Sequence, residues 1–299
     1  MTRMHRTLVN SIPFIFVFLW STGFIAAKYA LPFIEPFTLL FIRMILTIAA
    51  FLLLCALFRV KWLPMRQAGH QMVTGFLVHG TYLGGVFAAI KWGMPAGMAA
   101  IVVGVQPVLT ACLGWCYFGE YLRPKQWLGL GLGLAGVVTV LLNSGQQASV
   151  VLTWPAIMAA LSALVGISLG TLYQKRFGAG VNLLAGSLWQ YVSAALLMAI
   201  LAWGFESHEV VWDTQLILAL GWLVLGLSVT AILLLMYMIR EGETSKVASY
   251  FYLVPPVASI EAWFLFDESL TFWAIIAIAV TVIGVYLVTR TGRHQSREQ

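Results

Sequence analysis

The sequence predicts an all-α integral membrane protein with ten transmembrane helices. Of its 299 residues, 61% are hydrophobic and only 9% are charged, whereas a soluble domain is roughly a quarter charged. The hydrophobic residues form runs of about 20, the length that crosses a bilayer as a helix. The basic residues lie between these runs and form no basic helix or sheet face, a pattern typical of membrane loops that argues against a nucleic-acid partner.

Ten apolar segments follow one another along the chain, each long enough to be a span. Those of the N-terminal half are Ile12–Tyr29, Phe37–Phe58, Met72–Ile90, Ala96–Phe118 and Trp127–Leu142. Those of the C-terminal half are Pro155–Tyr173, Leu183–Gly204, Gln215–Ile239, Val247–Phe266 and Phe272–Val288. The first segment follows Arg3 and Arg6, as a secretory signal would. It is too long for one, has no small-residue cleavage site and leads straight into the next span.

Basic residues predict the orientation, because their translocation across the membrane is disfavoured. Ten spans put all but three of the 17 Lys and Arg residues on one side; the exceptions are Lys28, Lys91 and Arg43. Lys28 and Lys91 end spans on the opposite side, and Arg43 lies within the second span. Both termini are therefore expected in the cytoplasm, in agreement with an even number of spans.

The chain contains an internal repeat. The shift of 148 residues that takes Pro107 to Pro255 aligns the fourth and fifth spans with the ninth and tenth. It also pairs Trp115 with Trp263, Phe118 with Phe266, Glu120 with Glu268, Leu122 with Leu270 and Gly136 with Gly284. At a nearby offset, Arg43 pairs with Gln190. We expect two five-span repeats, residues 1–145 and 146–299; the odd number makes the second inverted, with Glu120 and Glu268 on opposite sides.

Inverted repeats are a common architecture of secondary transporters, whose substrate site lies near the membrane midplane between the repeats. Pro107 in the first repeat and Pro255 and Pro256 in the second mark matching places where a helix loses a backbone hydrogen bond. They are candidate helix breaks or hinges beside the site. The alternative is a harmless kink, since proline is common in membrane helices.

The repeated runs resemble a known family. Pro107 to Gly136 reads P-V-L-T-A…F-G-E-Y-L…G, and Pro255 to Gly284 reads P-P-V-A-S…F-D-E-S-L…G. With Pro36, Arg43 and the run A-I-K-W-G-M-P-A-G, these motifs resemble the drug/metabolite transporter superfamily in its ten-span form with two EamA domains. Within it, the chain is similar to bacterial inner-membrane exporters of aromatic and other neutral amino acids. The resemblance implies a cavity lined by spans one, three, four, six, eight and nine, with spans five and ten outside as a support.

Candidate substrate-binding residues are polar or aromatic groups in the implied cavity spans: Trp20, Phe24, His79, Tyr82, Gln106 and Tyr250. An amino acid presents an ammonium, a carboxylate and a side chain, and aromatic faces can hold the cation or stack on an aromatic side chain. Trp20 and Phe24 share one helical face. The alternatives are simple packing of the rings and, for His79, a hydrogen bond between helices.

Glu261 in the ninth span is the clearest buried carboxylate of the sequence. It could carry a coupled proton. The alternative is a structural ion pair with Arg43 or with a lysine.

The sequence therefore predicts a secondary transporter that exports small metabolites, aromatic and other neutral amino acids above all. A drug or quaternary-ammonium exporter is the alternative, with Glu261 as counter-charge. An intramembrane enzyme acting on lipid is a weaker one: Gly166, Ser168 and Gly170 match G-x-S-x-G, but within an apolar helix and without an Asp–His pair. No HExxH, P-loop or CxxC motif is present, so neither a metal nor a cofactor is expected. The oligomeric state is not indicated.

Overall fold

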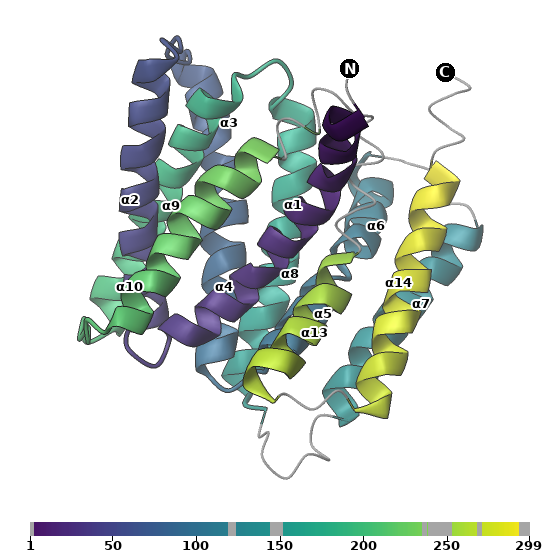
Figure 1. Cartoon of the computed structure of the whole chain (residues 1–299). Helices are drawn as coiled ribbons and strands as arrows, with labels where there is room; N and C mark the ends of the chain where they lie inside the picture. Colours follow the sequence, from purple (N-terminus) through teal and green to yellow (C-terminus); the bar gives the residue numbers. More distant parts are fainter. Residues whose placement is uncertain are drawn as a thin grey trace.

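Every regular element in the described part of the chain is a helix, the form in which a membrane-spanning segment satisfies its own backbone hydrogen bonds. The structure is a computed structural model that describes residues 3–118, 124–143, 152–234, 238, 253–267 and 271–292. The one β-type contact in these ranges is an isolated bridge between Ile34 and Val210. Figure 1 shows the helices side by side, with α1 (Arg3–Ala30) beginning and α14 (Phe272–Gly292) ending on the same side of the bundle.

The helices of the N-terminal half run in chain order from α1 to α7. After α1 come α2 (Pro36–Leu57), α3 (Met65–Gly75), η1 (Phe76–Tyr82), α4 (Leu83–Lys91), α5 (Ala96–Val103), α6 (Gln106–Phe118) and α7 (Pro124–Asn143). α3, η1 and α4 form one continuous helix from Met65 to Lys91, in which η1 is π-helical. Such wider turns occur frequently at functional sites.

The helices of the C-terminal half follow in chain order from α8 to α14. They are α8 (Trp154–Phe177), α9 (Leu183–Phe205), α10 (Thr214–Gly221), η3 (Trp222–Ala231), α13 (Val254–Phe266) and α14. The segment η3 is π-helical like η1. Polar side chains begin three of these helices by accepting from free backbone N–H groups: Thr153 for α8, Asn182 for α9 and Asp213 for α10.

Seven helices of the described chain are long and apolar enough to cross a membrane, and three shorter apolar helices accompany them. The seven are Ser11–Ala30, Pro36–Leu57, Met65–Lys91, Ala96–Cys116, Trp154–Phe177, Leu183–Phe205 and Thr214–Leu234. The shorter ones are Trp127–Gly136, Val254–Phe266 and Phe272–Gly284. An all-helical membrane fold is thus confirmed.

The predicted boundaries differ from the helices at several described places; α1, for example, begins at Arg3 and not at Ile12. The third span was expected from Met72, but its helix begins at Met65, because a helix can extend beyond its apolar stretch when its polar residues find protein contacts. Gln71 is buried there against α9. The fourth span is interrupted at Gly104 and Val105, between α5 and α6. Part of the predicted eighth and ninth spans, including Tyr250, lies outside the described residues, as do Glu120 and Glu268.

The shift of 148 residues found in the sequence also relates the helices. α6 and α13 begin at residues 106 and 254 and end at 118 and 266. α7 and α14 begin at residues 124 and 272. Each of these two pairs therefore consists of equivalent elements from the two halves.

The equivalent helices α7 and α14 pack against each other through glycines. A Cβ atom built on Gly136 would collide with Thr281, and one built on Gly284 would lie 2.6 Å from the backbone oxygen of Gly129 and 2.8 Å from the nitrogen of Gly133. Rising numbers in α7 meet falling numbers in α14, so the two helices are antiparallel. The absence of a side chain at these glycines lets the two helices pack closely.

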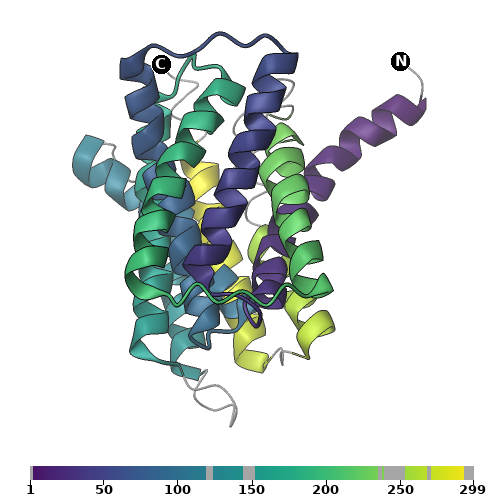
Figure 2. The same cartoon turned by 90° about the vertical axis from the view of Figure 1, so that its left-hand side faces the viewer.

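The equivalent helices α2 and α9 are joined at one end by two glutamates. Both carboxylate oxygens of Glu206 accept from the backbone at the start of α2, from Phe37 N and Thr38 N, each at 2.7 Å. In return, Glu35 accepts from Ser207 N at 2.7 Å. Figure 2 looks onto this side, where the loop from α9 to α10 crosses the end of α2. These contacts fix the two halves to each other at this end.

Candidate functional site

A partly open cavity lies between the two halves of the molecule. Its lining comes from α1, α2, η1, α4, α9 and η3 with the residue that follows it: Trp20, Gly23, Phe24, Arg43, Val78, His79, Tyr82, Leu83, Val86, Phe87, Tyr191, Leu227 and Ile232. The space that the centre of a water molecule can reach measures about 50 Å³. That is a third of the roughly 150 Å³ of a cavity that accepts benzene, so the walls must separate before an aromatic ligand can enter.

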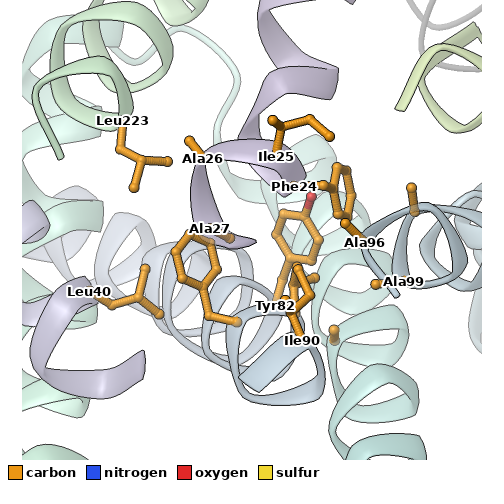
Figure 3. Close-up of a cluster of buried hydrophobic side chains, with 14 of the residues drawn as sticks. Phe24, Ile25, Ala26, Ala27, Leu40, Tyr82, Ile90, Ala96, Ala99 and Leu223 are labelled. Carbon is orange, nitrogen blue, oxygen red and sulfur yellow. The ribbon is translucent and has the colours of Figure 1, made fainter. Parts of the chain in front are cut away.

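Aromatic rings form much of this lining. Phe24 and Tyr82 are buried within the apolar cluster of Figure 3, and the half-buried Trp20 hydrogen-bonds Tyr82 through its side chain. The ring centroid of Phe16 lies 5.4 Å from that of Trp20 and supports it from the same helix. The cavity can therefore hold an apolar or aromatic group against ring faces and edges.

Arg43 is the one charged side chain that lines the cavity in the described chain. It is buried, and its Nε and Nη2 donate to Ser228 Oγ at 3.2 and 3.1 Å. Ser228 also hydrogen-bonds the buried Tyr191. No other hydrogen bond of the guanidinium forms within the described residues, although it carries five N–H donors. The cavity thus contains a positive charge whose donors are only partly used.

His79 begins a second polar chain. Its Nε2 lies 3.2 Å from Gln190 Oε1, and Gln190 Nε2 donates to Gln71 Oε1 at 2.7 Å. An amide oxygen only accepts, so with this amide orientation the imidazole donates from Nε2. The imidazole also stacks on Tyr191, with ring centroids 4.3 Å apart and an interplanar angle of 14°. The sequence left open whether His79 bonds between helices or lines the site, and the structure shows it doing both.

The two polar contacts occupy equivalent positions in the two halves. Arg43 and Gln190 are related by a shift of 147 residues, and His79 and Ser228 by one of 149. Arg43 reaches from α2 to Ser228 in η3, and Gln190 reaches from α9 to His79 in η1. Equivalent positions are therefore hydrogen-bonded across the halves twice, with the direction of donation reversed, and only the contact of Arg43 has a charged donor.

The two remaining candidates from the sequence are not among the described residues that line this cavity. Gln106 does not line it; its Nε2 contacts Thr110 and Thr171, which ties α6 to α8. Tyr250 lies outside the described residues.

The prolines stand at helix starts beside the interruption of the fourth span. Pro107 is the second residue of α6, and Pro255 and Pro256 open α13. A Cβ atom on Gly104 would collide with Pro255, so the interruption packs directly against the start of the equivalent helix. The helix is broken just before Pro107, whereas the residues just before Leu253 lie outside the described ranges; the role of the three prolines as hinges stays a prediction.

The expected ion pair between Glu261 and Arg43 is wrong. Glu261 Oε1 is 2.7 Å from Ser21 Oγ on α1, and Glu261 is absent from the cavity lining. The reason is geometric: α13 packs against α1 and α5, whereas Arg43 on α2 points to η3. Glu261 Oε2 is buried without a partner among the described residues.

The G-x-S-x-G run serves helix packing. It lies inside α8, where Ser168 Oγ donates to Leu164 O at 2.7 Å, one turn back. A Cβ atom on Gly166 would lie 3.0 Å from Leu77 O, and one on Gly170 would lie 2.5 Å from the side chain of Val78. The glycines let α8 approach η1 closely, as their small size predicts.

The candidates named from the sequence include neither Ser228 nor Gln71, and neither of the aromatic residues Trp189 and Tyr191 of the seventh span. Tyr191 lines the cavity, whereas Trp189 does not. The pairing of Arg43 with Gln190 in the repeat was the sequence signal for these cross-half hydrogen bonds. Equivalent residues of inverted repeats can lie close together near the axis that relates the two halves.

A bundle of apolar helices with antiparallel equivalent pairs, and with a polar and aromatic cavity between its halves, is an architecture common among membrane transporters. The model of the EamA-like transporter family matches residues 10–142 and again residues 154–290. The chain belongs to the EamA-like transporter family.

Named relatives agree with this membership. The chain is 31% identical over 226 residues to the uncharacterized inner membrane transporter YedA of Escherichia coli K12, which covers 76% of this chain and 72% of the relative. It is 28% identical to a probable amino-acid metabolite efflux pump of Salmonella typhimurium, over 93% of this chain and 95% of that one. The protein is thus a multi-pass transporter of the inner membrane, with a small-molecule substrate and the lipid bilayer as its surroundings.

A solved structure shares the fold. One crystal structure matches with a TM-score of 0.68 and covers 97% of this chain and 99% of its own, at 23% sequence identity. At this identity the likeness concerns the fold alone.

Proposed function

We propose that the protein exports small metabolites, aromatic and other neutral amino acids above all, as a secondary transporter. The observation that carries this proposal is the cavity between the halves, where aromatic rings surround one buried guanidinium. An amino acid with an apolar side chain matches both features, because the rings complement the side chain and Arg43 complements the carboxylate. The name of the Salmonella relative points the same way.

The proposed topology has ten spans in two inverted repeats, residues 1–145 and 146–299, with both termini in the cytoplasm. Here the three shorter apolar helices complete the seven longer ones. The antiparallel pairs α7 with α14 and α2 with α9 support inversion, and the basic residues support the orientation.

Alternating access follows from this arrangement. The cavity as it stands is too small for an aromatic amino acid, so the substrate enters when the halves part on one side and leaves when they part on the other. Trp20, Phe24, His79 and Tyr82 would contact it. Pro107, Pro255 and Pro256 would act as hinges.

Flux measurements in proteoliposomes test the proposed function. We expect uptake of labelled phenylalanine and other neutral amino acids, and little uptake of cationic dyes. Trp20→Ala, His79→Ala and Tyr82→Ala should each reduce the initial rate per folded molecule. Loss of a stacking contact of about 0.5–1.5 kcal/mol beyond lost area weakens binding by up to about tenfold. Normal flux in all three variants, corrected for folded amount, would reject the site.

An exporter of drugs or quaternary ammonium ions is less well supported. It would need a counter-charge for the cation, but Glu261 contacts Ser21 outside the cavity lining. Arg43 would repel the cation. The same flux assay with and without a pH gradient shows whether Glu261 carries a coupled proton.

A further inference from the structure

The charge of the cavity lining indicates which part of the substrate is recognised. The two equivalent cross-half contacts differ in charge and direction: the cationic Arg43 donates to Ser228, whereas the neutral amide of Gln190, at the position equivalent to Arg43, accepts from His79. A buried guanidinium with unused donors is costly unless an anion or further acceptors satisfy it. Within the described chain, Ser228 is its one hydrogen-bond acceptor.

The lining offers no matching group for a cation. No Asp or Glu is among the described residues that line the cavity, and Glu261 is held by Ser21. The α-ammonium of an amino acid would therefore meet only ring faces and neutral polar atoms, whereas the carboxylate would meet a full opposite charge with fork geometry.

We propose that Arg43 binds the substrate carboxylate, and that the site recognises the carboxylate and the apolar part of the substrate without requiring an α-amine. The inference rests on the proposed function and narrows its substrate class to carboxylates with an apolar or aromatic body, deaminated analogues included. Arg43 is then the specificity-determining residue, and Ser228 and Tyr191 position it.

Three compounds with the same ring isolate each charge: L-phenylalanine, 3-phenylpropanoate without the amine, and phenethylamine without the carboxylate. Each is titrated separately onto the purified full chain in lipid nanodiscs, with ligand-induced thermal stabilisation as the readout. We expect phenylalanine and 3-phenylpropanoate to bind within about tenfold of each other. Loss of a hydrogen bond to a charged group should make phenethylamine about 10- to 100-fold weaker.

Arg43→Gln gives this position the residue that the second half carries at position 190. Both carboxylates should then weaken by about 10- to 100-fold, while phenethylamine binding stays the same or improves. A merely structural role for Arg43 would weaken all three compounds alike. Arg59→Gln is the matched control, because Arg59 is exposed beyond the end of α2 and should change none of them.

The outcomes separate the two proposals. Binding of phenylalanine without binding of 3-phenylpropanoate overturns the inference but is compatible with amino-acid export. Tightest binding of phenethylamine also overturns the inference. Binding of 3-phenylpropanoate without phenylalanine supports the inference and rejects the amino-acid function. Binding of none of the three rejects both. If Arg43→Gln does not fold, the three titrations on the unsubstituted protein still decide.

Discussion

Two charged side chains in the spans, the buried Arg43 and the half-buried Glu261, carry groups that water would solvate in a soluble protein, and each has a polar partner on a distant helix. Arg43 contacts Ser228, and Glu261 contacts Ser21. The cavity distinguishes them: Arg43 lines it and Glu261 does not. Our proposal accordingly places substrate recognition at the cation, whereas the carboxylate is a contact between α1 and α13.

The first prediction concerns Glu261→Gln. The new amide oxygen can still accept from Ser21, and the amide nitrogen replaces an oxygen that has no described partner. We therefore expect the free energy of unfolding to change by less than about 1.5 kcal/mol, the size of one ordinary hydrogen bond. The preference for phenylalanine over cationic dyes should stay the same. Competition between phenylalanine and cationic dyes measures this preference. If the unsubstituted protein instead prefers dyes and Glu261→Gln abolishes that preference, the cation exporter is favoured.

At this scale the sequence predicted part of the cavity. Spacings of three and four residues bring side chains onto one helical face, which is why Trp20 and Phe24, and His79 and Tyr82, were recognised as groups and do line one cavity. Spacing within a helix says nothing about partners on other helices. Ser228 and the actual partner of Glu261 therefore became visible only in the structure.

Two helical elements depart from regular α-helix where they line the cavity. η1 and η3 widen to π-helix in equivalent spans, and both contribute cavity residues. Thr81 and Thr230 each donate a hydroxyl hydrogen bond to a carbonyl five residues earlier, Phe76 O and Leu225 O. Hydropathy cannot distinguish π-helix from α-helix, so these segments were not predicted, whereas the proline signal correctly marked the start of α6.

The second prediction concerns the glycine contact of α7 with α14. Gly284→Ala would press a Cβ atom against the backbone of Gly129 and Gly133, and neither backbone atom can move without shifting the helix. We expect a loss of about 1–3 kcal/mol of stability from overpacking, seen as a lower thermal midpoint in detergent. Gly131→Ala is the control on α7, because nothing lies within 4 Å of its added Cβ. Equal stability of the two variants would contradict this packing.

The whole molecule is organised by an approximate two-fold relation between its halves. The alignment of the repeats in the sequence predicted this relation, because equivalent prolines, tryptophans and glycines recur at one offset. The joint of Glu35 and Glu206 between α2 and α9 was not predictable, because loop residues of separate repeats meet only once both halves are folded.

The third prediction concerns topology. In a variant whose native cysteines are replaced, Lys61→Cys and Glu209→Cys each introduce one exposed thiol, in the loops after α2 and after α9. Lys61 belongs to the basic side and Glu209 to the acidic side. We expect an impermeant thiol reagent added outside intact cells to label the thiol at position 209 and to spare the one at position 61. The reverse pattern would invert the proposed orientation, and labelling at both positions would reject the proposed span count.

The lone guanidinium of the cavity also has an electrical consequence. A carrier that is positive when empty becomes neutral with a bound anionic carboxylate and stays positive with a bound zwitterion. One elementary charge that crosses the full membrane potential changes energy by about 2.3 kcal/mol per 100 mV. Membrane voltage would then act on the return of the empty carrier when an anion is exported, and equally on both half-cycles when a zwitterion is exported.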